Sequence, residues 1–205
     1  MEETKKHTKR SNYHHGDLKT QLIEATRVLV EQKGPDHFSV SEACRVAGVS
    51  TAAPYKHFKD KNEMLQEVAV AGMQRQREQM LEEVSVHPRG TLPRIVALGR
   101  VYIRFAQKEP GVFRLMFGLS EDHDEHATLS EMGEGTYTAV QQEVAWCRGS
   151  EAIEEQDTQR AFLLWSFVHG LSFLLIDGKL AHMNLDFDLE EVLNDVAERV
   201  IGPKA

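Results

Sequence analysis

Apolar residues recur at helical spacing along almost the whole chain. Leu18, Leu22, Ala25 and Leu29 share one side of a helix, and no stretch of alternating β-branched residues is long enough to indicate a strand. The pattern therefore predicts an all-α protein of about nine helices. The expected ranges are 18–33, 40–48, 51–58, 61–84, 92–108, 110–117, 129–147, 157–177 and 189–201.

Capping signals support several of these boundaries. Ser39 and Glu42, and again Asp60 and Glu63, have the spacing at which a cap side chain and an acid satisfy free backbone N–H groups at a helix start. Gly48 follows the second helix closely, so that helix has only about nine residues. A short capped helix, a tight turn and another short helix predict a helix-turn-helix over 39–61.

The composition of the motif fits that geometry. Small residues on the first helix let the second cross closely, and Gly48 supplies the left-handed backbone of the turn. Pro54 and Phe58 are four residues apart and are expected to point inward. The opposite face carries Thr51, Ala52, Tyr55 and Lys56, which suit contacts with base edges and phosphates in a major groove.

Charge is distributed unevenly along the chain. The net charge is −8, but residues 1–61 hold eleven Lys/Arg against eight Asp/Glu, whereas residues 62–205 hold thirteen against twenty-four. A basic end on an acidic body favours docking of that end on DNA. We accordingly expect an N-terminal arm and DNA-binding domain over 1–61, and a helical ligand-binding and dimerisation domain over 62–205.

Several motifs resemble the TetR/AcrR family of transcriptional regulators. The resemblance lies in the run 47–50 (Ala-Gly-Val-Ser), in Tyr55, His57 and Phe58, and in Lys61. The segment 13–18 and the Trp-x-x-x-His-Gly-Leu run over 165–171 resemble a branch named for a Trp-His-Gly (WHG) C-terminal motif. Pro54 departs from the Leu that is common in this family, which affects the first turn of the second helix.

The resemblance implies a regulator that binds a palindromic DNA operator as a homodimer, most often as a repressor released by a small molecule. It implies DNA contacts for eight residues, with Ser41 near the groove, Ser50 at the start of the second helix and Lys61 on a phosphate. The eight are Ser41, Ser50, Thr51, Ala52, Tyr55, Lys56, His57 and Lys61.

The helix expected over 157–177 is apolar around most of its circumference, more than one buried stripe explains. It needs partners on two sides, and Gly170 permits close approach of a second helix. With the resemblance, this predicts a dimer through the last two helices. An effector would bind between helices of the same domain, where we expect an aromatic pocket of Tyr102, Phe105, Phe113, Met116, Phe117, Tyr137, Trp146, Trp165 and His169.

Other functions find less support in the sequence. No nucleotide-binding, nucleophile-elbow or zinc-protease motif occurs, so we expect neither an enzyme nor a cofactor. A metal-sensing regulator using His123 and His126 remains an alternative, as does a sequence-tolerant DNA-coating protein. Two cysteines, no leader and no uninterrupted membrane span predict a cytoplasmic protein with reduced thiols.

Overall fold

The computed structural model describes residues 17–119, 127–182 and 187–202. Within these ranges the chain forms nine α-helices and one 3-10 helix with no strand, which confirms the all-α prediction. The helices are α1 (Asp17–Lys33), α2 (Val40–Ala47), η1 (Pro54–Lys56), α3 (Lys61–Ser85), α4 (Leu92–Lys108), α5 (Pro110–Gly118), α6 (Ala127–Arg148), α7 (Glu155–Ile176), α8 (Lys179–His182) and α9 (Leu189–Ile201).

The predicted cap side chains are in place at the starts of α2 and α3. The Ser39 hydroxyl accepts the Glu42 N–H at 3.2 Å, and Asp60 accepts the Glu63 N–H at 3.0 Å. The Glu42 carboxylate also accepts the Lys33 ammonium at 2.6 Å, which ties the first turn of α2 to the end of α1. These short contacts fix where α2 and α3 begin.

The second helix of the helix-turn-helix differs from the prediction. We expected a helix over 51–58, but the structure has a turn followed by the 3-10 helix Pro54–Lys56. Pro54 has no N–H to donate to the carbonyl of Ser50, and its ring would crowd that carbonyl in an α-helix. Ala53 instead donates to Ser50 over three residues, at 3.0 Å. The segment is therefore tighter and shorter than an α-helix.

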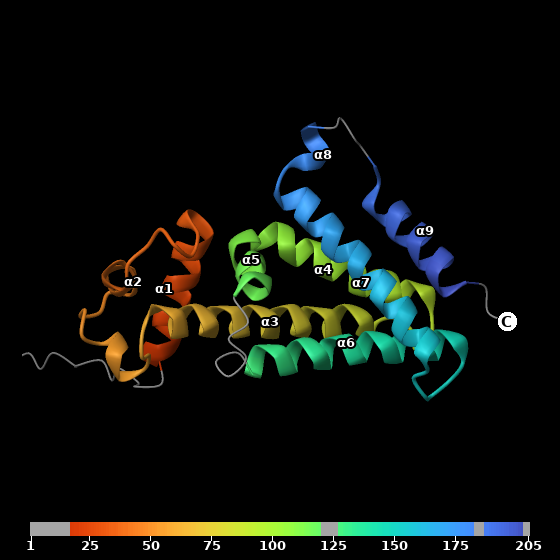
Figure 1. Cartoon of the computed structure of the whole chain (residues 1–205), viewed down its shortest axis with the longest axis horizontal. Coiled ribbons are helices and arrows are strands. Elements are labelled where there is room, and N and C mark those ends of the chain that lie inside the picture. Colours follow the sequence, from red (N-terminus) through yellow and green to blue (C-terminus); the bar gives the residue numbers. More distant parts are fainter. Residues whose placement is uncertain (1–16, 120–126, 183–186, 203–205) are drawn as a thin grey trace, which may run out of the picture.

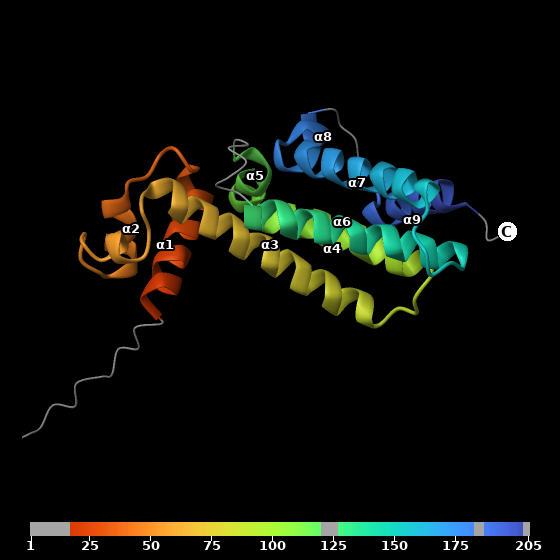
Figure 2. The same cartoon turned by 60° about the horizontal axis from the view of Figure 1, so that its bottom comes forward.

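Two units share one long helix. Figures 1 and 2 show α1 and α2 gathered at the N-terminal end of α3, while the rest of α3 runs along one edge of the unit formed by α4 to α9. In the small unit, α3 packs on α1, and the buried Met64 and Val68 belong to the same apolar cluster as Leu22 and Phe58. Farther along, α3 packs against α4, α5 and α6. One continuous helix, α3, therefore connects the small unit to the larger one.

The larger unit is built around α4. This helix packs against α3, α5, α6, α7 and α9, and more than half of its residues are buried. Of the described helices, α7 alone is long and apolar enough to cross a membrane, a test of length and composition that the core helix of a soluble protein also passes. In the structure α7 packs against α4, α6, α8 and α9.

Candidate DNA-binding face and ligand pocket

The turn between α2 and η1 has the predicted helix-turn-helix geometry. Gly48 adopts the left-handed conformation at φ 69°, and its N–H donates to the Arg45 carbonyl at 3.3 Å. The Val49 N–H donates to the Cys44 carbonyl at 2.9 Å, which closes the end of α2. Cys44 is buried and Val49 half-buried, so the turn is anchored on the apolar core.

The structure leaves most of the predicted DNA contacts open to a partner. Pro54 and Phe58 are buried, which confirms their inward orientation. Tyr55 is 65% exposed, and Ser41, Ser50, Thr51, Ala52 and Lys56 are also exposed. His57 is half-buried, with its ring 6.4 Å from that of Phe58.

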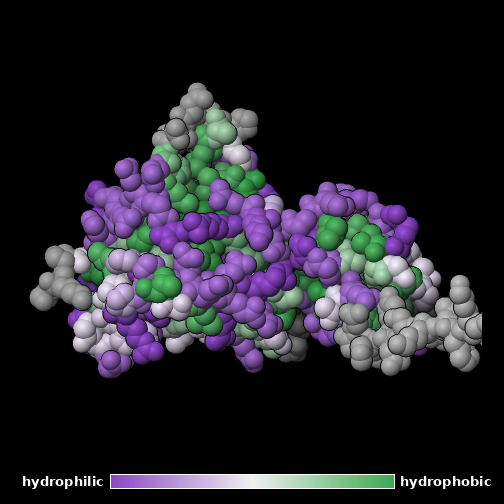
Figure 3. Space-filling view, turned by 180° about the vertical axis from the view of Figure 1, so that it is seen from behind, coloured by the Kyte–Doolittle hydropathy of each residue, from purple (hydrophilic) through white to green (hydrophobic). Residues whose placement is uncertain are grey.

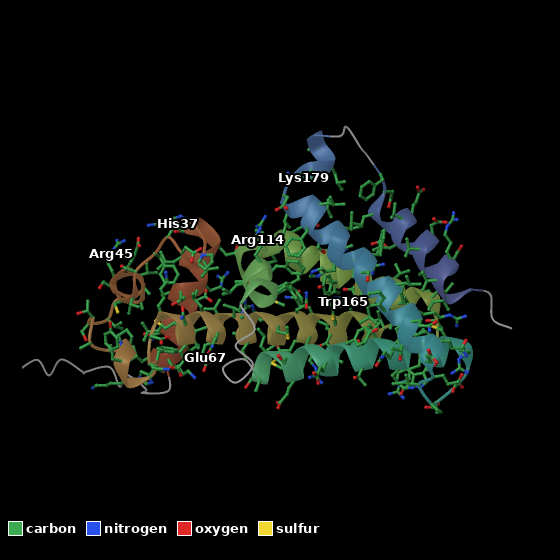
Figure 4. All side chains as sticks on the ribbon, viewed as in Figure 1. His37, Arg45, Glu67, Arg114, Trp165 and Lys179 are labelled. Atoms are coloured by element: carbon green, nitrogen blue, oxygen red, sulfur yellow. The ribbon has the colours of Figure 1, made fainter. Side chains whose placement is uncertain are left out.

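Lys61 has a more constrained position than the sequence suggests. It is half-buried at the first residue of α3, with its ammonium nitrogen 4.3 Å from the centre of the Phe38 ring. Such a cation–π contact contributes about 0.5–1 kcal/mol, so the side chain must leave the ring or share its charge to reach a phosphate. Figure 4 shows Arg45 and His37 at the outer rim of the same unit; neither was among the predicted contacts.

A cavity of about 520 Å³ lies in the larger unit. Its walls come from α3, α4, α5, α6, α7 and α9, and most of them are apolar. Met73, Gln76 and Met80 of α3 form one wall. This volume lies within the range of pockets that enclose small organic molecules.

Five of the nine predicted pocket residues line this cavity: Tyr102, Met116, Phe117, Tyr137 and Trp165. In Figure 4, Trp165 lies on α7 where that helix crosses the middle of the larger unit.

The other four predicted residues lie elsewhere. Phe105 and Phe113 are fully buried core residues. Trp146 lies outside the cavity, where its indole N–H donates to Glu151 at 3.0 Å. His169 does not line the cavity but bonds Tyr102, which does. Choosing by aromatic character therefore selected two core residues, Phe105 and Phe113, along with the five that line the cavity.

Tyr102 connects the cavity wall to His169. The Trp165 indole N–H donates to the Tyr102 hydroxyl oxygen at 3.3 Å, and that oxygen lies 2.8 Å from His169 Nδ1. Burial raises the pKa of Tyr102 and lowers the pKa of His169. With the phenol protonated and the imidazole neutral, the tautomer of His169 sets which of the two groups donates.

Gln76, the buried polar residue of the α3 wall, was not among the residues predicted from the sequence. Its side chain is 3% exposed, and the amide nitrogen Nε2 has no hydrogen-bond partner within the described residues. Met73, Gln76 and Met80 follow one another at spacings of three and four residues. This spacing is a sequence signal that places Gln76 on the inward face of the helix.

The helix α5 joins the cavity to the small unit. At its start, the Glu31 carboxylate of α1 accepts the N–H groups of Gly111 and Val112 at 3.0 and 2.8 Å. Met116 and Phe117, near its end, line the cavity. A side chain at Gly111 would lie 2.8 Å from a backbone oxygen of α1, so the two helices are in close contact.

A second polar contact joins the units beside this one. Glu109, which is buried just before α5, receives Arg75 of α3 at 2.5 Å, and the guanidinium of Arg27 on α1 lies 3.7 Å away. Three helices therefore meet at one buried carboxylate. The contacts of Glu31 and Glu109 together form what we call the α1–α5 clamp.

The outer face of α7 is apolar and uncovered. Phe162 and Leu163 are 54% and 55% exposed, Leu174 is exposed as well, and a Cβ added at Gly170 would meet no atom within 4 Å. In Figure 3, apolar surface also gathers at the top of the larger unit, in the region of α8.

The described residues include no group of three or more His, Cys, Asp or Glu side chains placed to hold a metal ion. His123 and His126, on which the metal-sensing alternative rests, lie outside the described ranges.

Comparison with known proteins agrees with this geometry. Residues 22–68 match the family model for bacterial regulatory proteins of the tetR family, and residues 95–200 match the model for the tetracyclin repressor-like C-terminal domain. The nucleoid occlusion factor SlmA of Idiomarina loihiensis is 23% identical over 166 residues, which cover 78% of this chain and 80% of that protein.

Solved structures share the fold. A protein of unknown function from Rhodococcus sp. RHA1 superposes with a TM-score of 0.78 at 25% identity, covering 94% of this chain and 97% of that one. A transcriptional regulator of the TetR/AcrR family from Thermobifida fusca gives a TM-score of 0.64 at 16% identity, covering 90% and 97%. With both ends of the chain matched by models of one family, the protein belongs to the TetR family of DNA-binding transcriptional regulators.

Proposed function

We propose that this protein is a ligand-responsive regulator that binds a palindromic operator as a homodimer and represses transcription until a small molecule releases it. The division of labour follows the two units, with DNA binding over 1–61 and ligand binding and dimerisation over 62–205. The Trp165, His169 and Gly170 motif favours the WHG branch of the family. A cytoplasmic, non-enzymatic protein without a cofactor is consistent with this role.

The observation that carries the proposal is the position of α3. One end of this helix holds Lys61 beside the helix-turn-helix, and Met73, Gln76 and Met80 on the same helix form a wall of the cavity. A ligand that fills the cavity contacts α3, and a displacement of α3 moves the DNA-binding unit packed on its other end. The α1–α5 clamp supplies a second mechanical connection, because α5 touches both the cavity and α1.

Dimerisation is the step that turns this movement into loss of operator binding. Two recognition segments must sit about 34 Å apart to read successive major grooves. The exposed Phe162, Leu163 and Leu174 on α7, together with the open backbone at Gly170, support a helix-to-helix interface with α9 alongside. Reversing a 99:1 population requires a ligand to prefer one state by about 5.5 kcal/mol.

DNA binding is tested by anisotropy titration of labelled DNA from the protein's own upstream region, with random DNA as competitor. Tyr55→Ala and Lys61→Ala should weaken binding at least tenfold. Lys179→Ala, an exposed lysine on α8, is the matched control and should bind normally. Normal binding by both Tyr55→Ala and Lys61→Ala would place the DNA contact elsewhere.

The same titration separates the main alternative. A DNA-coating protein would use the same exposed face but would depend on phosphates, so it would prefer its own upstream region by no more than a few-fold over random DNA. The similarity to a nucleoid occlusion factor makes the competition with random DNA necessary. A preference of a hundredfold or more, relieved by a metabolite, supports the ligand-responsive regulator.

A further inference from the structure

The lining of the cavity is informative about charge. Among the described residues that form it, there is no Lys, Arg or His, and the single ionisable carboxylate is Glu134, an exposed residue of α6. A carboxylate or phosphate moved from water into this cavity would lose its hydration and gain no cation in return, which is strongly unfavourable. The lining therefore disfavours anions.

Glu134 does not turn the cavity into a cation site. Its side chain is exposed, so solvent screens its charge, and screened surface charges contribute little to binding. Apart from the Gln76 amide and the Tyr102 hydroxyl, the buried part of the wall is made of thioethers and hydrocarbon, including Met73, Met80 and Met116. Methionine side chains adapt to irregular apolar shapes.

Gln76 adds one specific requirement. Its Nε2 is buried and unpartnered although the side chain lines the cavity. A buried donor without an acceptor costs about 1–3 kcal/mol. Nε2 itself has almost no accessible surface, so a ligand oxygen meets it once the Gln76 amide turns toward the cavity. That contact would remove the cost, so the cavity favours a ligand with a hydrogen-bond acceptor at its α3 wall.

We propose that the ligand of this cavity is an uncharged, largely apolar molecule with a carbonyl-type oxygen that accepts a hydrogen bond from Gln76. This inference deepens the proposed function and rests on it only in assuming that the cavity binds the effector. An acid of the same carbon skeleton binds poorly, because the cavity contributes a donor but no positive charge.

The test uses three probes that share a ten-carbon chain: methyl decanoate, decanoate and decyltrimethylammonium. The protein has two tryptophans, and Trp165 lines the cavity whereas Trp146 does not. In a Trp146→Phe background, tryptophan fluorescence therefore comes from Trp165 alone. We expect methyl decanoate to change Trp165 emission with a Kd at least tenfold below those of the other two probes.

Two variants of α3 then test the hydrogen bond. Gln76→Met keeps the length of the side chain and should weaken methyl decanoate five- to tenfold, with no fall in the melting temperature because an unsatisfied amide is removed. Gln74→Met is the matched control, because Gln74 is exposed and bonded to Glu78 at 3.1 Å. It should leave all three affinities unchanged.

The outcomes are distinct. Tighter binding of decanoate or of decyltrimethylammonium, or no binding of any probe, overturns the ligand class, as does a Gln76→Met variant with unchanged ester affinity. Ester binding that leaves operator affinity unaltered retains the ligand class and refutes the proposed regulation. Release of the operator by a charged metabolite alone retains the proposed regulation and refutes the ligand class.

Discussion

The α1–α5 clamp makes a specific prediction about Glu31. The helix α5 has no side-chain cap of its own, so its first N–H groups depend on the Glu31 carboxylate, with donor-to-acceptor distances of 3.0 and 2.8 Å. Glu31→Gln retains one acceptor oxygen and removes the negative charge, together with one of the two bonds. The first turn of a helix leaves such N–H groups without intrahelical partners.

The magnitude follows from these contacts. Loss of a hydrogen bond to a charged acceptor costs about 1.5–3 kcal/mol, and loss of a negative charge at a helix N-terminus adds roughly 0.3–1 kcal/mol. Since glutamine restores part of the first term, we expect the free energy of unfolding to fall by about 2 kcal/mol. Gln32→Ala is the control on the same helix, at an exposed position where a substitution usually changes the free energy of unfolding by no more than about 0.5 kcal/mol.

Urea denaturation at fixed protein concentration measures both free energies, and hydrogen exchange locates the change. The amides of Gly111 and Val112 should exchange faster in Glu31→Gln, and those of α4 should not. An effector should also release the operator less completely, because the cavity and α1 are more loosely connected. Equal stability losses in Glu31→Gln and Gln32→Ala would refute the clamp.

Three further predictions concern the larger unit. Leu163→Glu should dissociate the dimer with unchanged helix content, because it buries an unpaired carboxylate in the interface; sedimentation of the wild type as a monomer would contradict the interface. Because burial lowers the pKa of His169 below its ordinary value, the unfolded chain takes up this proton first as pH falls. Stability should therefore decline more steeply in the wild type than in His169→Gln once the pH falls below about 6.5, the ordinary pKa of histidine, and parallel curves would refute this. Asp157→Ala should lower the free energy of unfolding by roughly 3 kcal/mol, since the buried carboxylate binds Arg148 at 2.9 Å and caps α7 at the Glu154 N–H; an unchanged urea midpoint would show that the pair is dispensable.

The fold was accessible from sequence where local chemistry marks the boundaries. The helix over 92–108 was predicted with the bounds that the structure gives, since Thr91 precedes it, Pro93 lies in its first turn and Pro110 begins the next helix. The recognition segment shows the limit of such local signals. A helical pattern over 51–58 was outweighed by the single missing N–H of Pro54.

The cavity and the clamp were less accessible for a different reason. Which aromatic side chains face a cavity depends on how six helices cross, and residue type does not distinguish Tyr102 at the wall from Phe105 in the core. Glu31 reaches α5 across about eighty residues of chain, so no local spacing announces the contact. By contrast, Gln76 interrupts an apolar face of a long helix, a signal that can be sought directly.

In the proposed homodimer, two copies of the segment after Ser50 face the same side of the DNA duplex. Selection of DNA from a random pool with the purified protein tests it most directly. We expect enrichment of a two-fold symmetric sequence whose half-sites lie about one helical turn apart, lost in Tyr55→Ala and retained in Lys179→Ala. Enrichment of no sequence, or of a single half-site without symmetry, would contradict the claim.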